Sequence, residues 1–302
     1  MFEKLFSTAG LSLERLRSFL RVAEAGSITK AADGDPIKQS QFSRQIRELE
    51  TFFGTELTRR KGKSIELSPN GERLASLIRQ EFQALEDFHQ QVNAESRSFT
   101  LGAGGSILDW HVAQKSALVS KILPDVTWRF ESHRSKDLVE RVRDGRIDFA
   151  IVRRNAVPEG QPMKRLGVLS YIGAVPFTMA KRFGAAEELT LQELSQLPFA
   201  IPSTEGQFHE VLAKSFENED AILRPLAHCQ GFQQVWALIQ AGACAGVLPS
   251  ITPRDGFKAF QLPALASYRR DLVLHWNKRQ MERRNISPSL LRDIANAMVL
   301  PE

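Results

Sequence analysis

A set of polar side chains between residues 39 and 53 has the types and spacing needed to hydrogen-bond with DNA. Ser40, Arg44 and Arg47 fall on one face of an expected helix, with Ser43 at the edge of that face and Gln39 at the helix start. Hydroxyl, amide and guanidinium groups bind base edges and phosphates in the major groove. The same pattern also fits an ordinary solvated helix face. The surrounding elements therefore decide between the two interpretations.

The preceding residues predict the rest of a helix-turn-helix. Ser12 is an expected N-cap, and the helix that it starts can close at Gly26. Ser27 then caps a second, short helix, and Gly34-Asp35-Pro36 is expected to turn the chain. The third helix is predicted from about Gln39 to Phe53. Its inward face should consist of Phe42, Ile46 and Leu49, which are spaced four and three residues apart.

A basic hairpin is predicted directly after this helix. Residues 56–60 and 64–68 can pair as two strands, with Ile65 and Leu67 on the inner face. Between Lys38 and Lys63 there are seven Lys or Arg residues against three Asp or Glu residues. A basic hairpin beside such a helix is placed to hold the phosphates that flank a groove. The pattern therefore favours a winged helix-turn-helix.

A long helix is predicted from Ser68-Pro69 to about Ala94, because serine is a good N-cap and proline suits the first helical position. Its apolar residues recur at intervals close to 3.5, which is typical of a coiled-coil seam: Leu74, Ile78, Leu85, Phe88 and Val92. Glu81 interrupts this seam. The helix is either a dimerisation helix or one that packs on its own domain.

The C-terminal two hundred residues alternate apolar strands and helices, which predicts an α/β region with largely parallel sheets. Strands are expected at residues 99–102, 149–152, 172–175 and 199–201. A helix capped by Ser135 should end at Gly145. The sequence Gly104-Gly105-Ser106 after the first strand could bind an anion at a helix start, although glycine is common at such junctions.

Composition sets the class of the protein. The chain has 302 residues, 42% of them hydrophobic, and a net charge of +5. The mildly basic balance fits an anionic partner. Cys229 and Cys244 suggest either buried thiols or a redox pair, and their number allows no disulfide framework. Neither a secretory signal nor an apolar run long enough for a membrane span is present, so we expect a cytoplasmic protein without a membrane partner.

Together these motifs resemble the LysR-type transcriptional regulators. The resemblance is carried by LERLRSFLRVAEAGSITKAA, QSQFSRQIRELE and FFGTELTRRKGKSIELSPNGE, in that order, and by the long helix behind them. It implies an N-terminal all-α winged helix-turn-helix at residues 1–68, a linker helix for dimerisation at 69–97, and an effector-binding domain at 98–302. It further implies a C-terminal α/β effector domain like periplasmic binding proteins, with subdomain I at 98–170 and 270–302 and subdomain II at 171–269.

The resemblance implies a set of DNA contacts from the two short helices and the wing. The expected residues are Ser27, Thr29, Lys38, Gln39, Ser40, Gln41, Ser43, Arg44, Arg47, Arg60, Lys61 and Lys63. Two positions depart from the family pattern, which usually has serine where Lys38 stands and proline where Ser40 stands. Lysine accepts no N-cap hydrogen bond, so the helix start must be satisfied by another group. The DNA sequence preference should therefore differ from that of relatives.

The resemblance also implies a small-molecule effector in a cleft at the carboxyl ends of the strands. The expected residues offer hydroxyls, one imidazole and one guanidinium, which suit a small anion: Ser106, His133, Arg153, Ser203, Thr204 and Gly246. His133 could equally be structural, and Arg153 could belong to a solvated pair with Arg154. The expected partners are double-stranded operator DNA, a second copy or a tetramer of this chain, the effector, and RNA polymerase if the protein is an activator. No metal or cofactor is expected.

Two other functions stay open. An enzyme would use the two-lobed α/β region, but the sequence has no histidine spacing for a metal, no nucleophile elbow and no phosphate loop. A solute-binding or scaffolding module would keep the cleft and lack specific DNA binding. The sequence does not identify the effector, the target genes or the direction of regulation.

Overall fold

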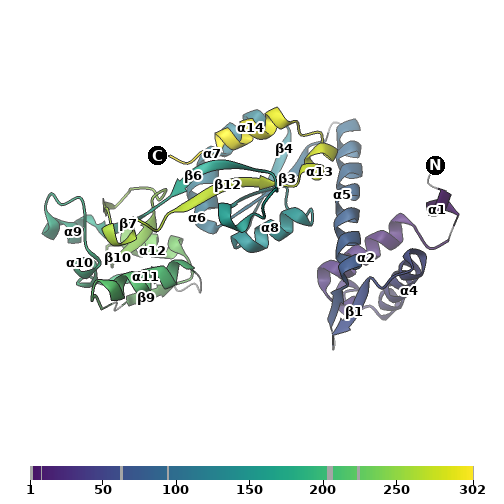
Figure 1. The fold of residues 1–302 in the computed structure, drawn as a ribbon, viewed down its shortest axis with the longest axis horizontal. Coiled ribbons are helices and arrows are strands. Elements are labelled where there is room, and N and C mark those ends of the chain that lie inside the picture. Colours follow the sequence, from purple (N-terminus) through teal and green to yellow (C-terminus); the bar gives the residue numbers. More distant parts are fainter. Residues whose placement is uncertain are drawn as a thin grey trace. The chain divides into compact units, whose positions relative to one another are not determined.

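The computed structural model describes residues 3–7, 9–61, 64–93, 95–202, 207–222 and 225–301 (Figure 1). Contacts divide these residues into two compact units. The first holds the described parts of Met1–Arg97, Glu140–Asp148 and Asn277–Ile286, and the second holds those of Ser98–Val139, Phe149–Trp276 and Ser287–Glu302. Each unit has its own core and is described by itself.

The N-terminal part of the first unit is a winged helix-turn-helix, as predicted. Its elements are α1 (Glu3–Phe6), α2 (Leu13–Ala25), α3 (Ile28–Ala31), α4 (Pro36–Phe53), β1 (Thr58–Lys61) and β2 (Ser64–Leu67). The inward faces of α2 and α4 form one apolar core with the start of the next helix. Phe19, Phe42 and Leu49 are buried at its centre. The strands β1 and β2 pair antiparallel.

The start of α4 differs from the sequence prediction. The helix begins at Pro36 rather than near Gln39, because the Asp35 carboxylate accepts hydrogen bonds from the backbone N–H groups of Ile37 (2.9 Å) and Lys38 (3.4 Å). Proline at the first helical position lacks only a donor that the helix would leave unpaired. Asp33 and Gly34, with φ of 52° and 80°, end α3 early. Within the expected turn at residues 34–36, Asp35 is therefore the N-cap of α4 and Pro36 is its first helical residue.

The long helix α5 (Pro69–Val92) has two different halves. In the first half, Leu74 and Ile78 pack into the core of the winged helix-turn-helix. In the second half, Leu85, Phe88 and Val92 are exposed, with Phe88 67% exposed. The five residues of the predicted seam therefore do not share one environment.

A buried ionic network fixes the second half of α5 to distant parts of the sequence. Arg284, 2% exposed, follows α13 (Lys278–Arg283) and donates to both carboxylate oxygens of Asp87 at 2.6 and 2.9 Å. It also donates to Asp148 at 2.6 Å, as does Gln280 at 2.7 Å. Burial alone would lower the pKa of Arg284, but Asp148 and Asp87 outweigh it, so the pKa is raised.

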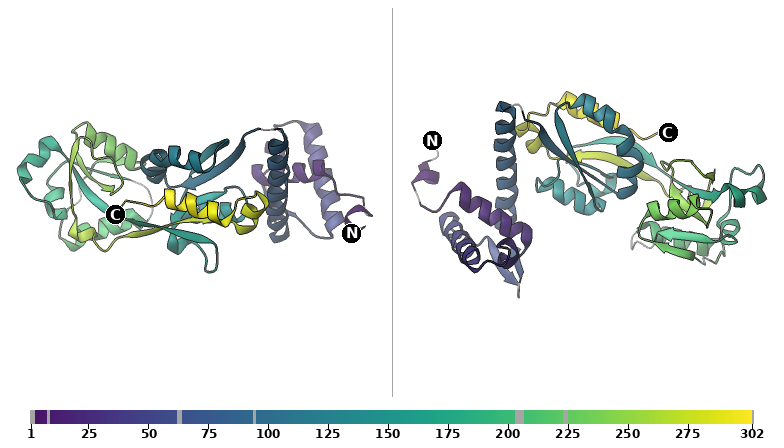
Figure 2. Two further views of the ribbon diagram at one scale, coloured as in Figure 1. Left: turned by 90° about the horizontal axis from the view of Figure 1, so that it is seen from above. Right: turned by 180° about the vertical axis from the view of Figure 1, so that it is seen from behind.

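The second unit contains two five-stranded sheets (Figures 1 and 2). The first has the order β4-β3-β5-β12-β6, and the second has the order β11-β7-β10-β8-β9. The strands of the first sheet are β3 (Arg97–Ala103), β4 (Val126–Ser132), β5 (Phe149–Arg153), β6 (Met163–Leu169) and β12 (Arg270–Trp276). Those of the second are β7 (Tyr171–Pro176), β8 (Phe199–Pro202), β9 (Pro225–Cys229), β10 (Ala245–Pro249) and β11 (Phe257–Phe260).

The expectation of largely parallel sheets was wrong. β3 pairs parallel with β5, and β8 pairs parallel with β9 and β10. β12, however, runs antiparallel to β5 and β6, and β7 runs antiparallel to β10 and β11. The chain passes from β6 in the first sheet to β7 in the second through Ser170, and it returns to the first sheet at β12. β7 and β12 therefore each enter from the other sheet, and each runs antiparallel to its neighbours.

Helices surround the strands of this unit. They are α6 (Gly105–Ile107), η1 (Leu108–Val112), α7 (Ala113–Ile122), α8 (Ser135–Arg143), η2 (Arg154–Ala156), α9 (Phe177–Ala180), η3 (Lys181–Phe183), α10 (Leu191–Ser195), α11 (Gln207–Asn218), α12 (Phe232–Gln240), η4 (Pro263–Leu265) and α14 (Pro288–Ala297). Figure 1 shows α7 and α14 on one face of the first sheet. Among the described helices, none combines the length and apolar character needed to cross a bilayer.

The two cysteines are both buried. Burial raises the pKa of Cys229, and it raises that of Cys244 to about 11, with a smaller contribution from the neighbouring Cys229 thiol. Thiols with raised pKa are poor nucleophiles, because only the thiolate reacts. The geometry therefore favours the interpretation of structural thiols.

Candidate nucleic-acid interface and effector cavity

The predicted donor face of α4 is exposed. Ser40, Arg44 and Arg47 all lie in the solvent-facing part of the helix, opposite the buried Phe42 and Ile46. This separation follows from the helical period, since the exposed residues are three or four positions apart. The helix thus presents one hydroxyl and two guanidinium groups on a surface supported by an apolar back.

The two arginines of this face have weak partners within their own helix. The Arg44 guanidinium lies 3.8 Å from a carboxylate oxygen of Glu48, and its side chain is 73% exposed. Arg47 donates to the hydroxyl of Ser43 at 3.0 Å and to the backbone oxygen of Ser43 at 3.3 Å. An exposed ion pair such as that of Arg44 contributes at most about 1 kcal/mol, and a hydrogen bond such as those of Arg47 contributes a similar amount. Both guanidinium groups can therefore exchange their partners for a phosphate or a base edge.

The other predicted contacts on α3 and α4 are partly engaged. The Ser27 hydroxyl caps α3 by accepting from the backbone N–H of Lys30. The Thr29 hydroxyl donates to the side-chain oxygen of Gln39 at 3.4 Å, and the Gln39 amide donates to the backbone oxygen of Gly34 at 3.1 Å. Gln41 donates to Glu14 on α2 at 3.1 Å. These bonds orient the polar groups at the start of α4.

Lys38 lies in the first turn of α4, and its ammonium group is 4.0 Å from Asp35. The sequence left open which group satisfies this helix start. The dipeptide Asp35-Pro36 is itself a helix-start signal, with an N-cap residue followed by proline, and it would have located the start correctly. Lys38 is consequently exposed and free of any capping role.

The wing carries its charges on exposed strands. Lys61 donates to Glu66 at 2.8 Å, and this hydrogen bond raises the pKa of the lysine. The backbone N–H of Ile65 donates to the backbone oxygen of Gly26 at 2.9 Å, which fixes the hairpin to the end of α2. Ile65 and Leu67 pack on the core, as predicted. Lys63 and the side chain of Arg60 lie outside the described residues.

The predicted effector residues lie at several places in the second unit. Ser106 is the second residue of α6, whose N-cap is Gly104. The His133 ring bonds the Glu131 carboxylate at 3.1 Å. Ser203 and Thr204 lie outside the described residues. Ser135, the expected cap of α8, is instead the first residue of that helix, and its hydroxyl accepts from the backbone N–H of Arg153 at 3.3 Å.

Gly246 is buried within β10 and is small for a packing reason. A Cβ atom there would lie 2.7 Å from a methyl group of Val235 on α12 and 3.2 Å from the backbone oxygen of Ala200 on β8. A contact of 2.7 Å requires a neighbour to move, and one of 3.2 Å is tighter than most Cβ contacts in proteins. The glycine therefore allows α12 to approach the sheet closely.

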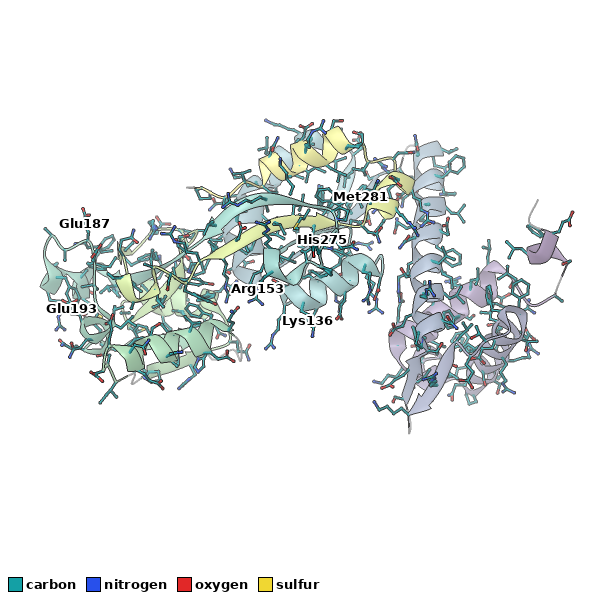
Figure 3. The ribbon with its side chains drawn as sticks, in the orientation of Figure 1. Lys136, Arg153, Glu187, Glu193, His275 and Met281 are labelled. Carbon is teal, nitrogen blue, oxygen red and sulfur yellow. The ribbon has the colours of Figure 1, made fainter. Side chains whose placement is uncertain are left out.

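Arg153 stands at the end of β5 (Figure 3) and lines a cavity of about 490 Å³. Its guanidinium donates to the side-chain oxygen of Gln207 at the start of α11. Arg270 lines the same cavity and donates to the Tyr268 hydroxyl at 3.1 Å from Nε. The volume falls in the usual range for small-ligand sites. No sequence pattern pointed to Gln207, Tyr268 or Arg270, because only the fold brings them to Arg153.

A larger cavity of about 1110 Å³ lies where β6 passes into β7. Four basic side chains line it, namely Lys164, Arg165, Arg254 and Arg269. None of the described residues predicted for the effector is among those that line it. In the described part of the chain, no group of three or more His, Cys, Asp or Glu residues could hold a metal ion.

Comparisons with known families match most of the chain. The family "Bacterial regulatory helix-turn-helix protein, lysR family" matches residues 13–72, and "LysR substrate binding domain" matches residues 93–287. A relative from Synechococcus elongatus, "Probable nitrogen assimilation transcriptional activator", is 32% identical over 47% of each chain. The regulator TtuA from Agrobacterium vitis is 24% identical over 81% of this chain and 82% of its own. The alignment thus spans about half the length of the first of these relatives.

Solved structures share the fold of the whole chain. A full-length OxyR variant from Pseudomonas aeruginosa matches with a TM-score of 0.64 and 15% identity, covering 96% of this chain and 98% of that one. Full-length CbnR in complex with its target DNA matches with a TM-score of 0.58 and 17% identity, covering 95% and 99%. At these identities the likeness concerns the fold alone.

Proposed function

This chain belongs to the LysR family of bacterial helix-turn-helix regulators, and from that premise we propose that it regulates transcription by binding operator DNA. The observation that carries the proposal is the exposed donor face of α4, in which Ser40, Arg44 and Arg47 stand free of the core. The wing of the same domain carries additional cations. The helix-turn-helix family is one of bacterial regulatory proteins, and the second family is a substrate-binding domain, so neither supports an enzymatic function.

We assign three roles to the proposed DNA-binding residues. Arg44, Arg47 and Lys38 contact bases or phosphates from α4, together with Gln39, Ser40, Gln41 and Ser43. Ser27 and Thr29 contact phosphates through their hydroxyl groups at the start of α3. Arg60, Lys61 and Lys63 hold phosphates beside the groove. Lys61 then exchanges Glu66 for a phosphate.

The protein acts as a dimer in this proposal, because one short helix gives modest affinity and two linked heads give much more. The exposed apolar side chains of α5, namely Leu77, Leu85, Phe88 and Val92, form the contact between two copies. The proposed boundaries are 1–68 for the DNA-binding domain, 69–97 for the linker helix and 98–302 for the effector domain. A tetramer, and contact with RNA polymerase in an activator, would build on this dimer.

We place the effector in the cavity beside Arg153, the one described residue of the predicted set that lines it. Ser106, His133 and Gly246 are not part of this lining, and Ser203 and Thr204 lie outside the described residues, so these five stay predictions. This cavity contains a predicted residue at the carboxyl end of a parallel strand, which the larger one does not. Arg153, Arg269 and Arg270 line it against Glu159 and Asp271, and Asp271 already pairs with Arg154 and Arg165. The excess of guanidinium groups favours a small organic anion.

The DNA-binding proposal is tested with the full chain and duplexes selected from a random library, by fluorescence anisotropy between about 50 and 200 mM salt. We expect the dissociation constant to rise steeply with salt concentration. Arg44→Ala should weaken binding about tenfold or more, which corresponds to a lost base or phosphate contact. Lys63→Ala should weaken binding and reduce the salt dependence.

Lys121→Ala provides the matched control, because it removes one exposed positive charge from α7. It should leave the affinity for the selected duplex within about twofold. If Arg44→Ala and Lys63→Ala behave like this control, the assigned surface is wrong. If no duplex is enriched by the wild-type chain, the proposed function itself is wrong.

A further inference from the structure

An apolar side chain stands at the N-terminal end of the donor face of α4. Ile37 is 80% exposed, although the rest of this face is polar. Single exposed apolar side chains are common on protein surfaces, so exposure alone means little. The position of Ile37 is more informative. It lies one helical turn before Ser40 and Gln41 and two turns before Arg44, so these four side chains form one stripe.

The early start of α4 puts Ile37 in this place. Asp35 accepts from the backbone N–H of Ile37 at 2.9 Å, and Pro36 is the first residue of the helix. Isoleucine is branched at Cβ and in a helix adopts mainly one χ1 rotamer. Its side chain is therefore held in a fixed direction before any DNA is bound. Within the described residues, the core of this domain is built without it.

The major groove contains one apolar group that such a side chain can recognise, the 5-methyl group of thymine. The other edges of the base pairs in this groove present donors and acceptors, which Ile37 cannot satisfy. Its neighbours in the stripe provide hydrogen bonds and charge, whereas Ile37 provides an apolar contact. Placing a polar edge against Ile37 would leave that edge unpaired, which disfavours other bases.

We propose that Ile37 is a specificity-determining residue that contacts the methyl group of one thymine in each operator half-site. This inference rests on the proposed function, because it requires α4 to enter the major groove. It adds a base preference that the charged residues of the face do not explain.

The test replaces thymines one at a time by deoxyuridine in a duplex selected by the wild-type full chain, which removes only the methyl group. Burying a group of this size contributes about 0.8 kcal/mol, or about fourfold in affinity at 1.36 kcal/mol per tenfold. We expect deoxyuridine at one position of each half-site to weaken binding about fourfold per half-site. Replacement of the other thymines should have less effect.

Variants of Ile37 connect the effect to this side chain. Ile37→Ala and Ile37→Ser should bind the thymine and deoxyuridine duplexes equally, whereas Ile37→Val should retain most of the difference. Because the side chain is exposed, these variants should fold normally, which thermal unfolding verifies. Leu13→Ala is the matched control, since Leu13 is an exposed apolar residue of α2 outside the stripe. It should keep the full fourfold difference.

The inference is overturned if the wild-type chain shows no position sensitive to deoxyuridine, or if Ile37→Ala keeps the same sensitivity as the wild type. A change in oligomeric state of Ile37→Ala without any loss of methyl dependence would also overturn it, and would place Ile37 between protein copies. Failure to enrich any duplex is a different outcome, because it removes the proposed function together with this inference.

Discussion

Two histidines of the second unit are buried and bonded to backbone carbonyls. The His111 Nε2 atom lies 2.9 Å from the backbone oxygen of Met298, and the His275 Nδ1 atom (Figure 3) lies 2.8 Å from that of Pro162. A carbonyl oxygen only accepts, so each of these nitrogens carries a hydrogen. Burial lowers the pKa of both histidines, and the carbonyl hydrogen bonds only partly oppose it. Neither histidine was distinguished by the sequence, which drew attention to His133.

The lowered pKa values predict a loss of stability in mild acid. Below the ordinary histidine pKa of about 6.5, histidines of the unfolded chain bind protons, whereas folded His111 and His275 stay neutral because their pKa values are lower. The contribution of these two histidines to the free energy of unfolding is therefore complete above that pH. It falls as the pH decreases through the folded-state pKa values. We expect the urea midpoint to fall between pH 7.5 and 5.5, and to fall less in His111→Gln. An identical fall in both proteins would contradict this assignment.

At the scale of elements, the connection between α5 and α13 depends on buried charges. Asp87 and Asp148 together hold Arg284, and Arg283 adds an ion pair with Glu81 at 2.6 Å. Glu81 interrupted the predicted seam of α5, and this pair explains why a carboxylate is kept there. A buried charge without its partner is costly because no water replaces the lost hydrogen bonds.

Asp87→Asn should therefore destabilise the first unit by about 3–5 kcal/mol, because it leaves the Arg284 guanidinium with one carboxylate instead of two. Urea unfolding followed by circular dichroism measures this change. Glu282→Gln is the control, since it breaks only the exposed pair of Glu282 with Lys278 at 3.9 Å and should cost less than about 0.5 kcal/mol. Equal effects of the two substitutions would show that the network contributes no more than a surface pair.

In the whole molecule, some apolar residues of α5 are packed in a core and others are exposed to solvent. Leu74 and Ile78 complete the core of the DNA-binding head, which agrees with a helix that packs on its own domain. Leu85, Phe88 and Val92 remain exposed, which agrees with a dimerisation helix. The two interpretations therefore apply to different residues of the predicted seam, and of those five residues Leu85, Phe88 and Val92 are available for a partner.

Phe88→Glu should convert the proposed dimer to a monomer, because it places a charge in the apolar contact between two copies. Sedimentation velocity measures the oligomeric state, and anisotropy should show that affinity for a two-half-site duplex falls by about a hundredfold as the avidity is lost. Phe177→Glu changes another exposed phenylalanine, outside α5, and should leave both measurements unchanged. A wild-type chain that sediments as a monomer would contradict the dimer proposal.

Features that local interactions specify could be predicted from the amino-acid sequence. Ser12, Ser27 and Ser68 cap the helices that they were expected to cap, and Gly26 and Gly54 end α2 and α4 in the left-handed conformation. The helical period separated the buried and exposed faces of α4 correctly. These features depend on a few neighbouring residues, so their signals are contained in short stretches of sequence.

Features that join residues distant in the chain could be identified only in the folded protein. Asp87 and Arg284 are 197 positions apart, and Arg153 meets Gln207 across 54 positions, so no local pattern could have paired them. The strands β7 and β12 reverse the expected parallel order because each returns from the other sheet. The apolar spacing of α5 likewise showed which side chains share a face, whereas the fold decided which of them the core would cover. Periodicity indicates which side chains lie on the same face of a helix, whereas their burial depends on which other parts of the chain pack against that face.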